Sequence, residues 1–170
     1  MSSIEIRKIG ITRLDTDAVV NAANSMLMQG GGVCGYIFND AGAKDMEEAC
    51  SKIGHCDEGN AVITPGFNLS AKYVIHAVGP RWSGGNNHEP QKLHDAYTSS
   101  LKLAKENNLH SIGFPLISAG IFGYPLIDAW KVALRSCREF INANPDYDIK
   151  IIFAVIDDTI KMIGQEMLNH

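Results

Sequence analysis

The sequence predicts a single α/β domain in which a largely parallel sheet lies between two layers of helices. Short apolar runs alternate with longer segments of helical periodicity, and no repeat, low-complexity tract or linker interrupts them. The length of 170 residues corresponds to about one domain. Because each helix returns the chain to the same edge of the sheet, this alternation favours parallel strands.

Six runs rich in apolar and β-branched residues are predicted to be strands. The first, IEIRKIG, alternates apolar and polar residues and is typical of an edge strand. The others are mostly continuous apolar runs, which is the pattern of strands covered on both faces. The predicted strands span residues 4–10, 17–23, 60–65, 73–78, 111–117 and 150–156.

Helical periodicity fills four of the intervals between and after these strands. In the third interval, apolar residues recur every three or four positions from Leu126 to Cys137, after a proline that suits a first helical turn. Asp157 or Asp158 can cap the last helix. The predicted helices span residues 32–52, 89–107, 125–143 and 157–168, and RWSGGNNHEP (81–90) is expected to be a flexible loop of no assigned role.

Composition and charge narrow the classes of partner. The net charge of -4 gives no general attraction to nucleic acid or to an anionic membrane, so neither is an expected partner. The longest apolar run, IIFAVI, is too short to span a bilayer, and the first residues lack the apolar stretch of a signal peptide. We therefore expect a cytoplasmic protein, acting as a monomer.

The four cysteines contain no CxxC pair and no zinc-finger spacing. In a cytoplasmic protein they are expected to be reduced thiols, with no metal and no cofactor.

Two loops rich in small residues follow predicted strands and lead into predicted helices: NAANSMLMQGGGVCG (21–35) and SAGIFGYP (118–125). Such loops can direct N–H groups at phosphate oxygens, and two of them suggest a site for a diphosphate. Gly30, Gly32 and Gly35 satisfy the G-x-G-x-x-G pattern. However, they do not directly follow a strand, and the next acidic residues precede the following strand, so a redox dinucleotide site is disfavoured.

Three stretches, VVNAANSMLMQGGGVCG, ITPGFNLSAKYVIHAVGPRW and PLISAGIFGYP, together resemble the macrodomain family, and within it the MacroD-type ADP-ribosyl hydrolases. They occur in the family's order and spacing, so the resemblance covers nearly the whole chain, residues 1–170, as one macrodomain. It implies a three-layer α/β/α sandwich with a mixed, largely parallel sheet and an ADP-ribose cleft above the strand ends.

The resemblance also implies a set of site residues. Asn24 would hydrogen-bond the distal ribose, Phe122 would pack against that ribose, and Cys34 occupies the position where the family often has an acid. Asn21 and His76 are expected to be structural. The implied ligand contacts are Ile11, Ala22, Asn24, Gly30, Gly31, Gly32, Val33, Ser118, Ala119, Gly120, Ile121, Phe122, Ile156 and Asp157, and the implied catalytic residues are Asn24, Cys34 and Phe122.

Four positions depart from the family pattern. Gly10 stands where the family has an aspartate for adenine, and Ile156 stands where it often has an aromatic residue. Cys34 and Phe38 replace an aspartate and a histidine in the catalytic loop. Cys34 is interpreted as a neutral filler, a polarised thiol or a nucleophile, and these three interpretations stay open.

The activity implied by the resemblance is hydrolysis of mono-ADP-ribose from acidic side chains of modified proteins, and possible deacetylation of O-acetyl-ADP-ribose, by water that the ligand's phosphate helps to hold. Removing a general base typically costs about 10²–10⁴ in rate, so the departures slow this reaction without abolishing it. One alternative is a non-catalytic reader of ADP-ribose. Another is a module for a different nucleotide or for single-stranded nucleic acid.

Overall fold

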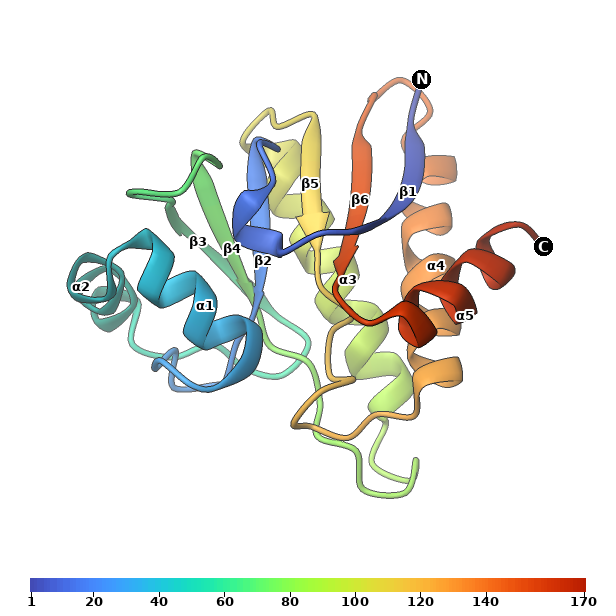
Figure 1. Ribbon diagram of the computed structural model, residues 1–170, viewed down its shortest axis with the longest axis horizontal. Helices are drawn as coiled ribbons and strands as arrows, with labels where there is room; N and C mark the ends of the chain where they lie inside the picture. The colour runs from blue at the N-terminus through green and yellow to red at the C-terminus, as the bar shows by residue number, and fades with distance from the viewer.

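A six-stranded mixed sheet forms the centre of the computed structural model, which describes residues 1–170 (Figure 1). The strand order is β1-β6-β5-β2-β4-β3, and every neighbouring pair is parallel except β3 with β4. All six predicted strands are confirmed, with small changes in their ends. The strands are β1 (Ser3–Lys8), β2 (Ala18–Ala22), β3 (Ala61–Pro65), β4 (Tyr73–Ala77), β5 (Ser111–Phe114) and β6 (Lys150–Val155).

Helices cover both faces of this sheet, as predicted. The 3-10 turn η1 packs with α1 and α2 on one face, while α3, α4 and α5 lie on the other (Figure 1). The helical elements are η1 (Ile11–Arg13), α1 (Gly32–Ala41), α2 (Ala43–Ile53), α3 (Glu89–Glu106), α4 (Leu126–Ala143) and α5 (Asp158–Leu168).

The single helix predicted over residues 32–52 is wrong, because the chain breaks it at Gly42. Gly42 has φ +107°, which side chains rarely adopt, and its N–H donates to the carbonyl of Phe38. The glycine thus ends α1 and lets α2 begin in a new direction. The predicted cap of α5 is confirmed, since the Asp157 carboxylate accepts from the N–H of Ile160 at 3.0 Å.

Two apolar cores stabilise the sandwich, one on each side of the sheet. The larger core packs α3, α4 and α5 against the strands and includes the Tyr97, Phe114 and Phe153 rings in mutual contact. The smaller core packs α1 and α2 and includes Phe38 and Met46. Together these cores position the strand ends from which the loops depart.

The sheet has its switch point between β2 and β5. These neighbouring parallel strands end at the same edge, but β2 leads to α1 on one face and β5 leads to α4 on the other. Chains that leave in opposite directions open a crevice between them, and ligands of open α/β sheets bind in such crevices.

Candidate functional site

A cleft of about 300 Å³ lies at this switch point, above the carboxyl ends of β2, β4 and β5. Both loops predicted from the sequence contribute to its walls, although they are about ninety positions apart in the chain. The lining residues are Ala22, Ala23, Asn24, Gly30, Gly31, Gly32, Val33, Cys34, Gly79, Arg81, Pro115, Leu116, Ile117, Ser118, Gly120, Ile121 and Phe122.

The glycine loop forms one wall and delivers the start of α1 to the cleft. Gly32 has φ +58°, a left-handed conformation that glycine adopts without steric cost. Gly31 precedes the helix, and no side chain caps it. Main-chain N–H groups at the first turn are therefore available to an anion, and the helix dipole adds partial positive charge there.

Gly35 lies in the first turn of α1 and lets the loop fold back onto the helix. A Cβ on Gly35 would lie only 2.8 Å from the carbonyl oxygen of Gly30. No such contact is tolerated by real side chains, so the position of Gly30 in the cleft depends on the missing Cβ. The glycines of this stretch thus have different roles: Gly32 provides a left-handed backbone conformation, and Gly35 allows the carbonyl of Gly30 to approach the helix closely.

Asn24 closes the loop that precedes these glycines. Its Nδ2 donates to the carbonyl of Met28 at 2.9 Å, and its Oδ1 accepts from the N–H of Met28 at 3.0 Å. Because the second N–H of the amide and a lone pair of Oδ1 remain, the same side chain can also meet a ligand. Asn24 therefore shapes the loop and lines the cleft at once.

Cys34 lies beneath the cleft wall in a buried polar network. Its Sγ is 3.6 Å from the Met28 carbonyl oxygen, to which the thiol donates, and 3.6 Å from Asn21 Nδ2, from which it accepts. The same Nδ2 lies 3.0 Å from His76 Nδ1. Protein groups thus contact the sulfur on two sides, which supports the interpretation of Cys34 as a filler at the start of α1.

The Asn21 amide lies between Cys34 and His76. His76 is fully buried, and its Nε2 lies 3.0 Å from Thr64 Oγ1. Burial lowers the pKa of His76 to about 4, so the ring is neutral at physiological pH. These contacts agree with the expectation that Asn21 and His76 are structural, and they place no base against the thiol.

Phe38 faces the core rather than the cleft. It is buried, and its ring meets the His76 ring edge to face with centroids 6.4 Å apart. The position where a histidine is often found in the resembling family is thus filled here by apolar packing. No titratable group takes its place, because the cleft lining contains no histidine and no carboxylate.

The second loop forms the opposite wall. Ser118 has φ +67°, is buried, and leaves its Oγ without a protein partner. A Cβ on Gly79 would lie 2.3 Å from this Oγ, so the glycine that follows β4 makes room for the loop. On the far side, the Ile121 Cδ1 lies 3.3 Å from the position of a Cβ on Gly31. The two walls therefore come close to each other across the cleft.

Four of the residues implied as ligand contacts do not line this cleft. Ile11 is buried in the smaller core, and Ala119 packs against the larger one. Ile156 is 71% exposed beyond the end of β6, and the Asp157 carboxylate is occupied in capping α5. These four assignments remain predictions.

Several lining residues were not named from the sequence: Ala23, Gly79, Arg81, Pro115, Leu116 and Ile117. The first five positions after β4 are VGPRW, and they lie inside one of the stretches that resemble the family. That resemblance is the sequence signal by which Gly79 and Arg81 could have been assigned to the site. Arg81 is the only charged residue in the lining.

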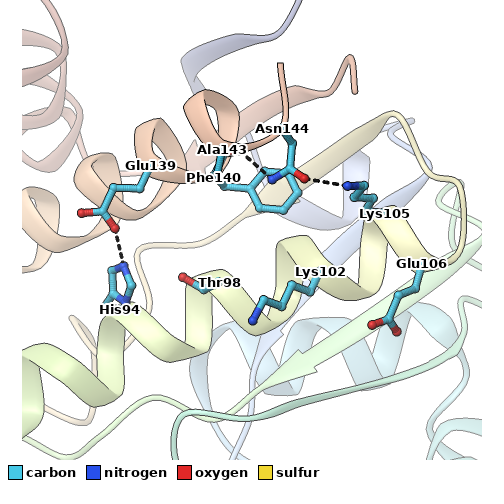
Figure 2. Close-up of a pocket in the computed structure, with 9 residues that line it drawn as sticks. All are labelled: His94, Thr98, Lys102, Lys105, Glu106, Glu139, Phe140, Ala143 and Asn144. Carbon is cyan, nitrogen blue, oxygen red and sulfur yellow. Dashed lines mark hydrogen bonds and ion pairs between the residues drawn. The ribbon is translucent and has the colours of Figure 1, made fainter. Parts of the chain in front are cut away.

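A larger hollow, about 590 Å³, lies on the helical face between α3 and α4 (Figure 2). Figure 2 shows that its polar side chains pair across the groove: His94 Nε2 lies 2.7 Å from Glu139, and Lys105 Nζ donates to the Asn144 amide oxygen at 2.6 Å. Because this groove lies in the outer helical layer, whereas the cleft lies at the switch point where ligands of open α/β sheets bind, we assign the site to the cleft.

The structure contains no helix long and apolar enough to cross a membrane. It also contains no group of three or more histidine, cysteine, aspartate or glutamate side chains that could hold a metal ion.

A three-layer α/β/α sandwich with a glycine-rich cleft at its switch point is typical of domains that hold phosphate groups by main-chain amides. The chain matches the family model described as Macro domain over residues 20–133. A relative from Escherichia fergusonii, named O-acetyl-ADP-ribose deacetylase, is 49% identical, over 99% of this chain and 97% of the relative.

Solved structures show the same family. The Oceanobacillus iheyensis macrodomain with ADP has a TM-score of 0.93 and 34% identity, over 99% of this chain and 90% of that chain. The Trypanosoma brucei macrodomain in complex with ADP-ribose has a TM-score of 0.90 and 35% identity, over 97% of this chain and 68% of that chain. The chain described here therefore belongs to the macrodomain family.

Proposed function

We propose that this macrodomain binds ADP-ribose and hydrolyses acyl esters of its distal ribose. The substrates are O-acetyl-ADP-ribose and mono-ADP-ribose attached to acidic side chains of modified proteins. The observation that carries the proposal is the cleft itself, in which two small-residue loops present main chain to a diphosphate and no carboxylate repels it. A relative named as a deacetylase and a structural neighbour solved with ADP-ribose support the same ligand.

The arrangement favours positioning over proton transfer. The start of α1 and the loop at Ser118 would hold the phosphates, while Asn24 and Phe122 would orient the distal ribose. Because no histidine or carboxylate lines the cleft, a phosphate oxygen of the ligand is the available proton acceptor for the attacking water. The absence of a protein base predicts turnover about 10²–10⁴ slower than with one.

A non-catalytic reader is the second candidate, and a specific observation favours it. The lining contains only two ionisable residues, Arg81 and Cys34, and the thiol of Cys34 donates to a main-chain carbonyl. A reader would bind ADP-ribose through the same loops and release no product.

Calorimetry followed by a turnover assay separates these candidates. We expect ADP-ribose to bind, AMP to bind more weakly and an oligonucleotide not to bind. With excess enzyme, we expect release of acetate from O-acetyl-ADP-ribose and of ADP-ribose from a glutamate-modified peptide, both reduced in Asn24→Ala. Binding without any release would establish the reader, and tight binding of the oligonucleotide alone would refute both candidates.

Asn24→Ala needs a check on folding, because it also removes two hydrogen bonds to Met28. Each is expected to contribute about 0.5–1.5 kcal/mol to the free energy of unfolding. Urea denaturation of the variant would show whether it is folded under the assay conditions. Lys52→Met, which removes an unpaired surface charge outside the cleft, is the control for general effects of substitution.

A further inference from the structure

The loop between β4 and α3, residues 81–88, is anchored rather than free, which corrects the expectation of a flexible loop without a role. Glu89 at the start of α3 is buried, and its carboxylate accepts from main-chain N–H groups of the loop. Oε2 accepts from Ser83 and Gly85, each at 2.9 Å, and Oε1 accepts from Asn87 at 2.6 Å. One carboxylate therefore binds the loop main chain at three positions.

The beginning of this loop is attached to the second wall of the cleft. The N–H of Trp82 donates to the carbonyl of Phe122 at 2.8 Å, and the Trp82 and Tyr124 rings are in contact with centroids 4.8 Å apart. These two contacts place Arg81 at the mouth of the cleft. Its guanidinium carbon lies 4.8 Å from the centroid of the Phe122 ring, in a cation–π arrangement.

Arg81 is a cation without an anionic partner. No carboxylate lies within ion-pair distance of it. The two acidic residues that share its outer surface are both occupied, since Glu58 pairs with Lys92 at 3.1 Å and Glu89 binds the loop main chain. Arg81 is exposed and held in place by its neighbours, and no carboxylate of the protein uses its five N–H donors. It can therefore bind an anionic group of a ligand.

The position of Phe122 indicates the kind of anion that Arg81 binds. This step rests on the proposed function. If Phe122 packs against the distal ribose, the guanidinium above its ring lies beside the group attached to that ribose. The diphosphate has main-chain donors on both walls and does not need this side chain. We propose that Arg81 binds the carboxylate that is released from the ribose ester, and so makes the cleft selective for acyl substrates.

Both proposed reactions produce such a carboxylate. In deacetylation, water adds to the acetyl carbonyl, the bond from that carbon to the ribose oxygen breaks, and acetate, the ribose hydroxyl and one proton result. In removal of ADP-ribose from glutamate, water forms a bond to the anomeric carbon while the bond to the carboxyl oxygen breaks. The electron pair of that bond leaves with the glutamate carboxylate, and the proton of the water passes to a phosphate oxygen of the ligand and from there to solvent. In deacetylation, Arg81 stabilises the negative charge that forms on the acetyl carbonyl oxygen when water adds, and then the acetate product. In removal of ADP-ribose from glutamate, it stabilises the negative charge on the departing carboxylate.

Arg81→Met tests the inference, because methionine retains an apolar stem that can pack on Phe122 and removes the charge. A hydrogen bond between charged groups predicts a fall in kcat for O-acetyl-ADP-ribose of about 10- to 100-fold. The Kd for ADP-ribose, which has no acyl group, should stay within about twofold of the original value. Arg81→Lys should recover part of the rate, because it restores the charge but not the planar donor geometry.

The matched control is Lys52→Met, which removes the same charge from an exposed residue of α2 that neither lines the cleft nor pairs with a carboxylate. It should leave both kcat and Kd unchanged. If Arg81→Met instead weakens ADP-ribose binding by the factor by which it lowers kcat/KM, Arg81 binds the diphosphate and the inference is wrong. Unchanged turnover in Arg81→Met would also overturn it.

A second measurement does not depend on turnover. Acetate is titrated into protein saturated with ADP-ribose, at constant ionic strength, and its binding is followed by NMR. We expect acetate to bind at least about tenfold more weakly to Arg81→Met than to the unmodified protein. Equal acetate affinities would overturn the inference. A protein that shows this difference but hydrolyses no ester would retain the carboxylate site while refuting the proposed hydrolase activity.

Discussion

Gly35→Ala tests whether the position of the glycine loop controls ligand binding. Gly35 belongs to α1, where alanine is a better helix former than glycine by about 1 kcal/mol. On helix propensity alone, the substitution would stabilise the protein. The new Cβ, however, would lie 2.8 Å from the carbonyl oxygen of Gly30, whereas ordinary contacts begin near 3.4 Å. The loop must therefore retreat by about 0.6 Å, a distance that follows from these two separations.

The two effects act on different measurements. Overpacking of this kind costs about 1–3 kcal/mol, and the helix propensity of alanine offsets about 1 kcal/mol of it. The free energy of unfolding should therefore fall by at most about 2 kcal/mol. Since Gly30 lines the cleft, the displaced loop should affect the ligand far more. A displacement of about 1 Å can cost 10²-fold in rate, so we expect about a tenfold loss in turnover and in ADP-ribose affinity.

Calorimetry with ADP-ribose, the turnover assay and urea denaturation of Gly35→Ala would measure these quantities. Asp40→Ala is the control, because it changes an exposed residue of the same helix toward alanine without touching the loop. Affinity and turnover equal to those of the unmodified protein would refute the reasoning, because they would show that the Gly30 carbonyl can move without changing the ligand site.

Two further substitutions test other parts of the site. Cys34→Asp should raise kcat at least tenfold, because it supplies a carboxylate near the ribose. It should also weaken ADP-ribose binding, because the carboxylate repels the diphosphate. An unchanged kcat would mean that the side chain at this position does not reach the attacking water. Glu89→Gln should lower the urea midpoint at pH 7. Burial opposes ionisation of Glu89, but the N–H groups of Ser83, Asn87 and Gly85 lower its pKa from 4.5 to about 2. Because the folded-state pKa is depressed, the stabilisation is complete above about pH 4.5 and is lost as the pH falls toward 2. The midpoint difference between the two proteins should shrink over that window, and a constant difference would exclude the carboxylate charge as its cause.

Much of the fold followed from patterns that are local in the chain. Alternation of apolar strands with periodic helices predicted all six strands and the two-sided covering of the sheet, because burial on both faces requires continuous apolar runs. The break at Gly42 escaped this reasoning. A glycine within a helical pattern is compatible with a continuous helix, and only the backbone angle of +107° shows that the chain turns there.

The motifs of the sequence by themselves determined the family and identified the two loops of the cleft, because main-chain approach to phosphate requires small residues at fixed positions. Only the tertiary structure decided how individual side chains are used. It placed the Asn21 amide between Cys34 and His76, and it brought Arg81 over the ring of Phe122. These contacts join residues far apart in the chain, and they depend on the order of strands in the sheet, which local periodicity does not encode.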